Sequence, residues 1–138
     1  MSSSTLHLIE AAVEALCSLN AQAFARCFTP DARLVLPNGQ QLQGRAEIQG
    51  ALADLSQRLI QVDLKISGMT IAAGTAYVAW HWRSLARQTG KWQVSDNLIV
   101  LQFNQGLISA WREYQAQPLE NPASPQPASL KSQRPPDA

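Results

Sequence analysis

The sequence has little that would serve metal binding or cross-linking: two cysteines, two histidines and 15% charged residues in 138. Cys17 and Cys27 match no metal-ligand spacing, so we interpret them as reduced packing thiols of a cytoplasmic protein. With so few histidines and no carboxylates clustered beside them, a metal site has almost no ligands to draw on. Glycine motifs of nucleotide-binding loops are missing as well. We therefore expect no metal and no cofactor.

Long apolar runs and an excess of positive charge are also missing. No stretch approaches the roughly 18 uninterrupted apolar residues of a membrane-spanning helix, and no basic segment precedes an apolar run near the N-terminus. A net charge of +1 leaves no basic stripe that could neutralise phosphates. We expect neither a membrane nor a nucleic acid as partner.

What the sequence does contain is 46% hydrophobic residues, enough for one domain with a buried core. The composition changes after Gln117, because residues 118–138 hold six of the eight prolines and only two large apolar residues, Leu119 and Leu130. Such a segment cannot bury enough surface to offset its conformational entropy. We predict a folded domain over residues 1–117 and a disordered Pro-rich tail over residues 118–138.

Apolar spacing predicts helices first and long strands afterwards. Residues at helical spacing favour a helix over about 5–19, a short second helix and a third helix after Gly44. From Gln61 onward the pattern alternates with period two, with a bend bracketed by Gly68 and Gly74. Segregated helices and strands predict an α+β fold, in which three N-terminal helices pack on a curved, mixed and mostly antiparallel sheet. This cone-shaped α+β barrel has an interior, where we expect a site.

Several short motifs follow one another in a characteristic order. They are Leu19-Asn20-Ala21, Phe28 through Asp31-Ala32, Pro37 with Gly39, Gly44-Arg45 with Ile48, Phe103-Asn104-Gln105-Gly106-Leu107-Ile108, and Trp111-Arg112-Glu113-Tyr114. In this order they resemble the nuclear transport factor 2-like superfamily, and within it SnoaL-like and ketosteroid-isomerase-like proteins, over residues 5–116. The resemblance implies a homodimer that packs through the outer sheet face and a pocket for a small hydrophobic ligand. It implies no reaction, because the fold carries isomerases, cyclases, hydrolases and non-catalytic binders.

The catalytic residues of ketosteroid isomerases are missing. By resemblance, their general-base aspartate falls on Leu36, their oxyanion-hole tyrosine on Ala15 and their oxyanion-hole aspartate on Ile99. All three side chains are apolar here, so that proton transfer has neither a base nor hydrogen-bond donors for its anionic intermediate. We therefore exclude ketosteroid isomerisation.

The limonene-epoxide-hydrolase-like proteins end in a tract similar to residues 111–114, with an aspartate at the position of Glu113. Alignment on that tract puts their catalytic arginine and its partner acid on Trp80 and Trp82. One carboxylate thus survives as Glu113. Activation of water by a single glutamate stays open, whereas the three-residue mechanism does not.

SnoaL-like cyclases use a histidine and an aspartate on neighbouring strands, and the matching pair here is His81 and Asp96. If Trp80 and Trp82 face the pocket, strand alternation sends His81 and Asp96 to the outer face, where contact in a dimer is their expected role. A bulge would reverse this assignment. We keep the two residues as an alternative catalytic pair.

The predicted pocket is an aromatic box with one carboxylate. Its lining comprises Ala15, Leu34, Leu36, Trp80, Trp82, Asn97, Ile99, Trp111 and Glu113. Three indoles suit a planar or polyunsaturated apolar ligand; the alternative is that they only fill the cone. Glu113 is the candidate catalytic residue, because a carboxylate isolated among indoles is desolvated and its pKa is raised. The alternative for Glu113 is an ion pair with Arg83 or Arg45.

Three functions stay open at this point. The first is a dimeric protein that binds a small hydrophobic molecule and acts on it by acid-base catalysis through Glu113, as an isomerase, cyclase or hydrolase. The second is a non-catalytic carrier or sensor of such a ligand. The third is a protein-protein interaction module that uses the outer sheet face and has a filled cone.

Overall fold

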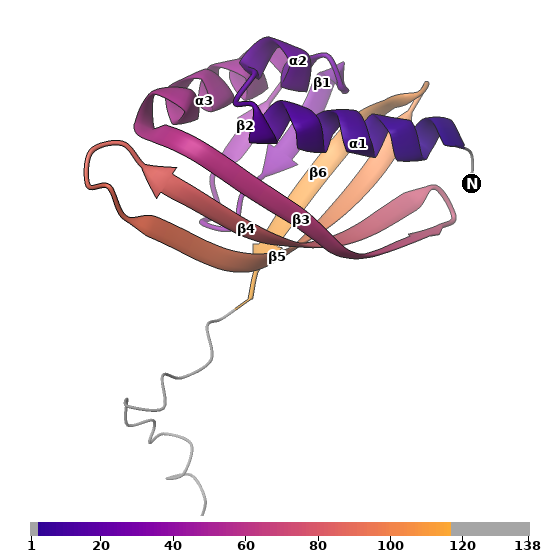
Figure 1. The fold of residues 1–138 in the computed structure, drawn as a ribbon. Helices are drawn as coiled ribbons and strands as arrows, with labels where there is room; N and C mark the ends of the chain where they lie inside the picture. Colours follow the sequence, from indigo (N-terminus) through magenta and orange to yellow (C-terminus); the bar gives the residue numbers. More distant parts are fainter. Residues whose placement is uncertain (1–2, 117–138) are drawn as a thin grey trace, which may run out of the picture.

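Helices precede most of the sheet, as the apolar spacing predicts (Figure 1). The computed structural model describes residues 3–116, so the predicted tail at 118–138 lies outside the described residues. The helices are α1 (Ser3–Cys17), α2 (Ala21–Ala25) and α3 (Arg45–Arg58). The strands are β1 (Phe28–Val35), β2 (Gln41–Gln43), β3 (Leu59–Ala72), β4 (Thr75–Ala86), β5 (Trp92–Asn104) and β6 (Leu107–Gln115). In the described part of the chain, no helix combines the length and the apolar character that crossing a membrane requires.

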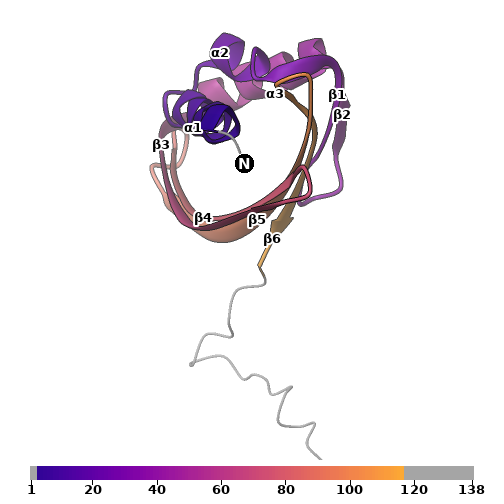
Figure 2. The ribbon, with the colours of Figure 1, turned by 90° about the vertical axis from the view of Figure 1, so that its right-hand side faces the viewer.

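The strands form one six-stranded sheet in the order β2-β1-β6-β5-β4-β3. Neighbours are antiparallel except β1 and β6, which run parallel. The long strands curve beneath the three helices, which lie on the concave side of the sheet (Figure 2). The predicted fold class is confirmed: three helices cover a curved, mixed and mostly antiparallel sheet.

The first two helices are joined by a tight corner. α1 ends at Cys17, two residues before the predicted end, because Leu19 adopts a left-handed backbone with φ of 54°. Asn20 then caps α2, since its side-chain oxygen accepts a hydrogen bond from the backbone N–H of Ala23 at 3.0 Å. This corner places α2 against both α1 and α3.

The hairpin between β3 and β4 differs from the prediction. Gly68 lies inside β3, where the pairing with β4 shifts register between Ile66 and Gly68. The turn itself is made by Ala73 and Gly74, both with positive φ. An extra residue in one strand bends it without ending it, so the strand continues past Gly68 and the sheet gains curvature there.

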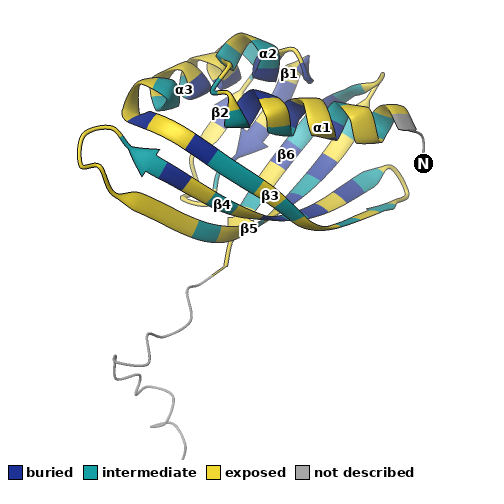
Figure 3. Ribbon diagram, in the orientation of Figure 1, coloured by how far each residue is buried: buried dark blue, intermediate teal, exposed yellow. Residues whose placement is uncertain are grey.

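The core lies between the helices and the concave face of the sheet. Inward residues alternate with exposed ones along the strands (Figure 3). Aromatic rings pack edge to face in this layer, with ring centres 4.9 Å apart for Phe24 and Phe28 and 5.4 Å for Phe24 and Trp111. Trp80 extends the cluster at 5.7 Å from Trp111. These contacts hold the aromatic side chains next to the site in place.

Candidate functional site

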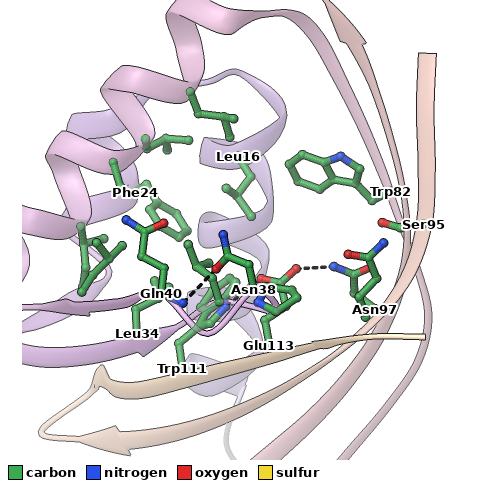
Figure 4. A pocket seen from close by; sticks show the side chains of 18 of the residues that line it. Leu16, Phe24, Leu34, Asn38, Gln40, Trp82, Ser95, Asn97, Trp111 and Glu113 are labelled. Atoms are coloured by element: carbon green, nitrogen blue, oxygen red, sulfur yellow. Dashed lines mark hydrogen bonds between the residues drawn. The ribbon is translucent and has the colours of Figure 1, made fainter. Parts of the chain in front are cut away.

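A cavity of about 680 Å³ lies between the helices and the concave face of the sheet, a size typical of small-molecule sites. The helices contribute apolar side chains and, at the opening, Asp54 and Arg58; the strands contribute indoles and the polar pair Asn97 and Glu113 (Figure 4). Its apolar lining includes Leu16, Phe24, Leu34, Leu36, Leu52 and Leu55. Exposed polar residues mark its opening: Asn38, Gln40, Asp54, Arg58, Gln93 and Gln115. The cavity is therefore apolar inside and polar at the rim.

Strand alternation determines which side chains reach this cavity. Trp80 and Trp82 on β4 both line it, and so do Trp111 and Glu113 on β6. Asn97 on β5 is the direct cross-strand partner of Trp80 and also lines the cavity. Each pair along a strand is two residues apart, the repeat that keeps side chains on one face. Leu36, just after β1, completes this part of the wall.

Glu113 is held by two neutral donors. Trp111 donates its indole N–H to one carboxyl oxygen over 3.1 Å, and the Asn97 amide N–H₂ donates to the other (Figure 4). Burial raises the pKa of Glu113, although both hydrogen bonds act to lower it. None of the ion pairs within residues 3–116 involves Glu113. The two hydrogen bonds therefore orient the carboxyl group, and no positively charged side chain of the described residues is paired with it.

The alternative ion pair of Glu113 with Arg83 or Arg45 is wrong. Arg83 donates to Asp63 at 2.9 Å and lies over the ring of Trp92, 4.2 Å from its centre. Arg45 donates twice to the backbone carbonyl of Phe28, at 3.1 and 2.5 Å, and so ties the first turn of α3 to β1. Both guanidinium groups are engaged away from the cavity.

His81 and Asp96 meet, but on the other side of the sheet. Nδ1 of His81 lies 2.8 Å from a carboxyl oxygen of Asp96, and both side chains are exposed. Neither residue lines the large cavity. Asp96 borders a smaller hollow of about 270 Å³ together with Tyr114. The pairing of β4 with β5 and of β5 with β6 thus places His81 and Asp96 on the opposite face of the sheet from Glu113.

Ile99 is a correction to the expected lining. Its side chain is 0% exposed, and it does not line the cavity. Its cross-strand partners are Val78 and Glu113, and Val78 and Leu101 beside it are also buried, so packed side chains fill this part of the cone. Ala15 is likewise buried in the core, outside the lining.

The sequence interpretation expected Ala15 as the contribution of the helices and missed that of α3. Ala51 and Leu55 of α3 line the cavity, and Asp54 and Arg58 lie at its opening with 3.2 Å between their charged atoms. The apolar spacing on α3 indicates an inward face, but it does not distinguish a core contact from a cavity wall.

Clusters that could hold a metal do not occur in the described part of the chain, where no three His, Cys, Asp or Glu side chains come together. Among the described residues, the ionisable side chains that line the cavity are Asp54, Arg58 and Glu113. Asp54 at the rim is already paired with Arg58.

Comparison with known proteins places this geometry in context. A family model described as a SnoaL-like domain matches residues 9–111. No curated protein matches the sequence.

Solved structures share the fold at low sequence identity. A protein of Catenulispora acidiphila with a ketosteroid isomerase-like fold, in complex with trimethylamine, has a TM-score of 0.73 at 18% identity over 78% of this chain and 83% of that one. An NTF2-like protein of unknown function from Burkholderia pseudomallei has a TM-score of 0.74 at 15% identity, over 84% of this chain and 92% of that one. An LEH-like epoxide hydrolase of M. tuberculosis has a TM-score of 0.73 at 14% identity, over 83% of this chain and 84% of that one. These likenesses show a common fold.

Proposed function

Because the chain belongs to the SnoaL-like domain family, we propose that it binds a small hydrophobic molecule in the 680 Å³ cavity and exchanges a proton with it through Glu113. The observation that carries the proposal is a carboxyl group in an apolar cavity wall whose hydrogen bonds, in the part of the chain that the structure describes, come only from neutral donors. Family membership favours a ligand-binding or catalytic role, and the solved relatives include an epoxide hydrolase.

The surroundings of Glu113 suit a group that gives and takes a proton. Its raised pKa brings the protonated form closer to neutral pH, where an acid or base works best. The N–H groups of Trp111 and Asn97 each occupy one lone pair of the carboxyl. A second lone pair on each oxygen, or the acid proton, is left for a ligand. Isomerisation, cyclisation and hydrolysis all use such a group.

A non-catalytic carrier or sensor is the second candidate. Leu36, Ala15 and Ile99, at the positions of the isomerase machinery, are apolar, which favours holding a ligand over converting it. The protein-interaction module with a filled cone is disfavoured, because the cavity measures about 680 Å³.

We further propose that the outer face of β4, β5 and β6 forms a homodimer contact. This face exposes large apolar side chains, namely Tyr77, Leu98 and Tyr114. Exposed apolar surface of this kind marks interaction sites. In such a dimer His81 and Asp96 would lie at the contact, away from the cavity.

The proposal is tested with molecules that copurify with the protein. They are released by denaturation, identified by mass spectrometry and returned to fresh protein, either wild type or the variants Glu113→Gln and Glu10→Gln. Glu10 is exposed on α1 and serves as the matched control.

Conversion by wild type and Glu10→Gln, with loss of at least a hundredfold in Glu113→Gln, is the expected result. Equal conversion by all three proteins contradicts a chemical role of Glu113. Recovery of the molecule unchanged from wild type favours the carrier.

A further inference from the structure

Two buried polar atoms of residues that line the cavity have no hydrogen-bond partner within residues 3–116. They are the indole Nε1 of Trp80 and the side-chain oxygen of Asn97. Trp80 and Asn97 are directly paired across β4 and β5, and both line the cavity. Native proteins pair nearly all of their buried polar groups, so two unpaired atoms on directly paired residues of one cavity wall indicate a partner from outside the chain.

The orientation of the Asn97 amide follows from its neighbour. Its N–H₂ donates to Glu113, which leaves the side-chain oxygen as an acceptor without a donor. Trp80 offers the opposite, an N–H donor without an acceptor, on a side chain that is only 3% exposed. Trp80 and Asn97 thus leave one buried donor and one buried acceptor unpaired at this end of the cavity.

Inside the polar rim, the cavity wall is mainly apolar: Leu16, Phe24 and Leu34 lie across the cavity from Asn97 (Figure 4), and Leu52 also lines it. A matching ligand has an apolar body and a single polar end group. Resting on the proposed binding function, we infer that the ligand is an uncharged molecule with a carbonyl that accepts from Trp80 and an adjacent N–H or O–H that donates to Asn97. Primary carboxamides and hydroxycarbonyl compounds are of this class.

Charged ligands match the two unpaired atoms less well. An organic cation could pair with Glu113, but its ammonium group has no lone pair for the Trp80 N–H. A carboxylate could accept from Trp80, but it has no donor for Asn97 and is repelled by Glu113 once that group ionises. Only a neutral end group with both functions satisfies the two atoms together.

The test uses three naphthalene probes of nearly equal shape. The end group of 2-naphthamide has both acceptor and donor, that of 2-acetonaphthone has the acceptor only, and that of 2-isopropenylnaphthalene has neither. Equilibrium dialysis measures the dissociation constant of each probe with the full chain. We expect affinity to rise roughly fivefold or more with each added function, since a neutral hydrogen bond contributes a factor of this order.

Two variants test whether the differences in probe affinity come from the Trp80 N–H and the Asn97 oxygen. Trp80→Phe keeps a ring but removes the N–H, so the advantage of 2-acetonaphthone over 2-isopropenylnaphthalene should disappear. Asn97→Ser shortens the acceptor out of reach, so the advantage of 2-naphthamide over 2-acetonaphthone should disappear. Trp82→Phe is the control: Trp82 lines the same cavity, yet its indole nitrogen is not one of the two unpaired atoms.

The outcomes separate this inference from the proposed function. Equal affinity of wild type for all three probes overturns the inference while apolar binding stands, and this readout needs no variant to fold. Unchanged preferences in Trp80→Phe overturn the assignment to Trp80. Failure of every probe to bind contradicts the cavity as a binding site and overturns the inference with it.

Discussion

Trp111 donates its indole N–H to the carboxyl group of Glu113, 3.1 Å away and two residues further along β6. The two side chains share a face because strand side chains alternate. The indole is itself fixed by the rings of Phe24 and Phe28, with ring centres 5.4 and 5.8 Å away. The aromatic core of the cone therefore sets the position of the acid in the cavity wall.

Replacing Trp111 by Phe should raise the pKa of Glu113 further. The substitution removes one of the two hydrogen bonds that lower this pKa, while burial, the larger influence, remains. A carbon-13 NMR titration of the Glu113 carboxyl measures the change. Trp92→Phe is the control, because Trp92 is exposed on β5. A pKa that stays the same or falls in Trp111→Phe contradicts the assigned bond.

The stability of the wild type should depend on pH in a way that Glu113→Gln does not share. The pKa of Glu113 is raised in the folded protein from its ordinary value of 4.5. The folded state therefore holds this proton more tightly than the unfolded chain. The associated stability is present below pH 4.5 and is lost as pH rises through the folded pKa.

Relative to Glu113→Gln, the wild-type free energy of unfolding should fall over that range, by about 1.4 kcal/mol for each unit by which the pKa is raised. Urea titrations at a series of pH values give this difference, with Glu10→Gln as the exposed control. Parallel profiles for wild type and Glu113→Gln would contradict desolvation of Glu113.

A large side chain at Ala51 should fill the cavity. Ala51 lines it from α3, so an indole there occupies the space of a ligand. Ala51→Trp should weaken binding of 2-isopropenylnaphthalene at least tenfold, because the apolar contact area of the probe is lost. Ala53→Trp, on the exposed side of the same helix, should bind as wild type does. Undiminished binding to Ala51→Trp would place the probe elsewhere.

A charge on the outer sheet face should dissociate the proposed dimer. Leu98 is 41% exposed on β5, and Ile60, 50% exposed on β3, is the matched apolar control. Light scattering after size-exclusion chromatography should give a dimeric mass for wild type and Ile60→Glu and a monomeric mass for Leu98→Glu. A monomeric wild type, or a dimeric Leu98→Glu, contradicts a contact on this face.

The fold class and the family resemblance are confirmed, and the reason is physical. Helical and strand periodicities are local properties, and the order of helices and strands restricts the architecture to few choices. Alternation also separates Trp80 from His81, which face opposite sides of β4. Local pattern therefore predicts which side of the sheet a residue faces.

How deeply a side chain is buried, and which side chain it pairs with, are not local properties of the sequence. Ile99 faces inward as alternation predicts, but the packing of Val78 around it decides that it is core rather than cavity wall. Arg83 pairs with Asp63, twenty residues away, because β3 and β4 align these two positions. The bulge before Gly68 is likewise visible only once both strands are paired. The sequence left open whether Glu113 pairs with Arg83, and the register of β3 and β4 decides this by giving Arg83 another partner.

The most direct test of the account is the titration of the Glu113 carboxyl in the free protein and with 2-isopropenylnaphthalene bound. An apolar probe in the cavity displaces water beside the carboxyl and increases its desolvation. The account predicts a pKa above 4.5 in the free protein and a higher one in the complex. A pKa at or below 4.5 that the probe leaves unchanged would contradict it.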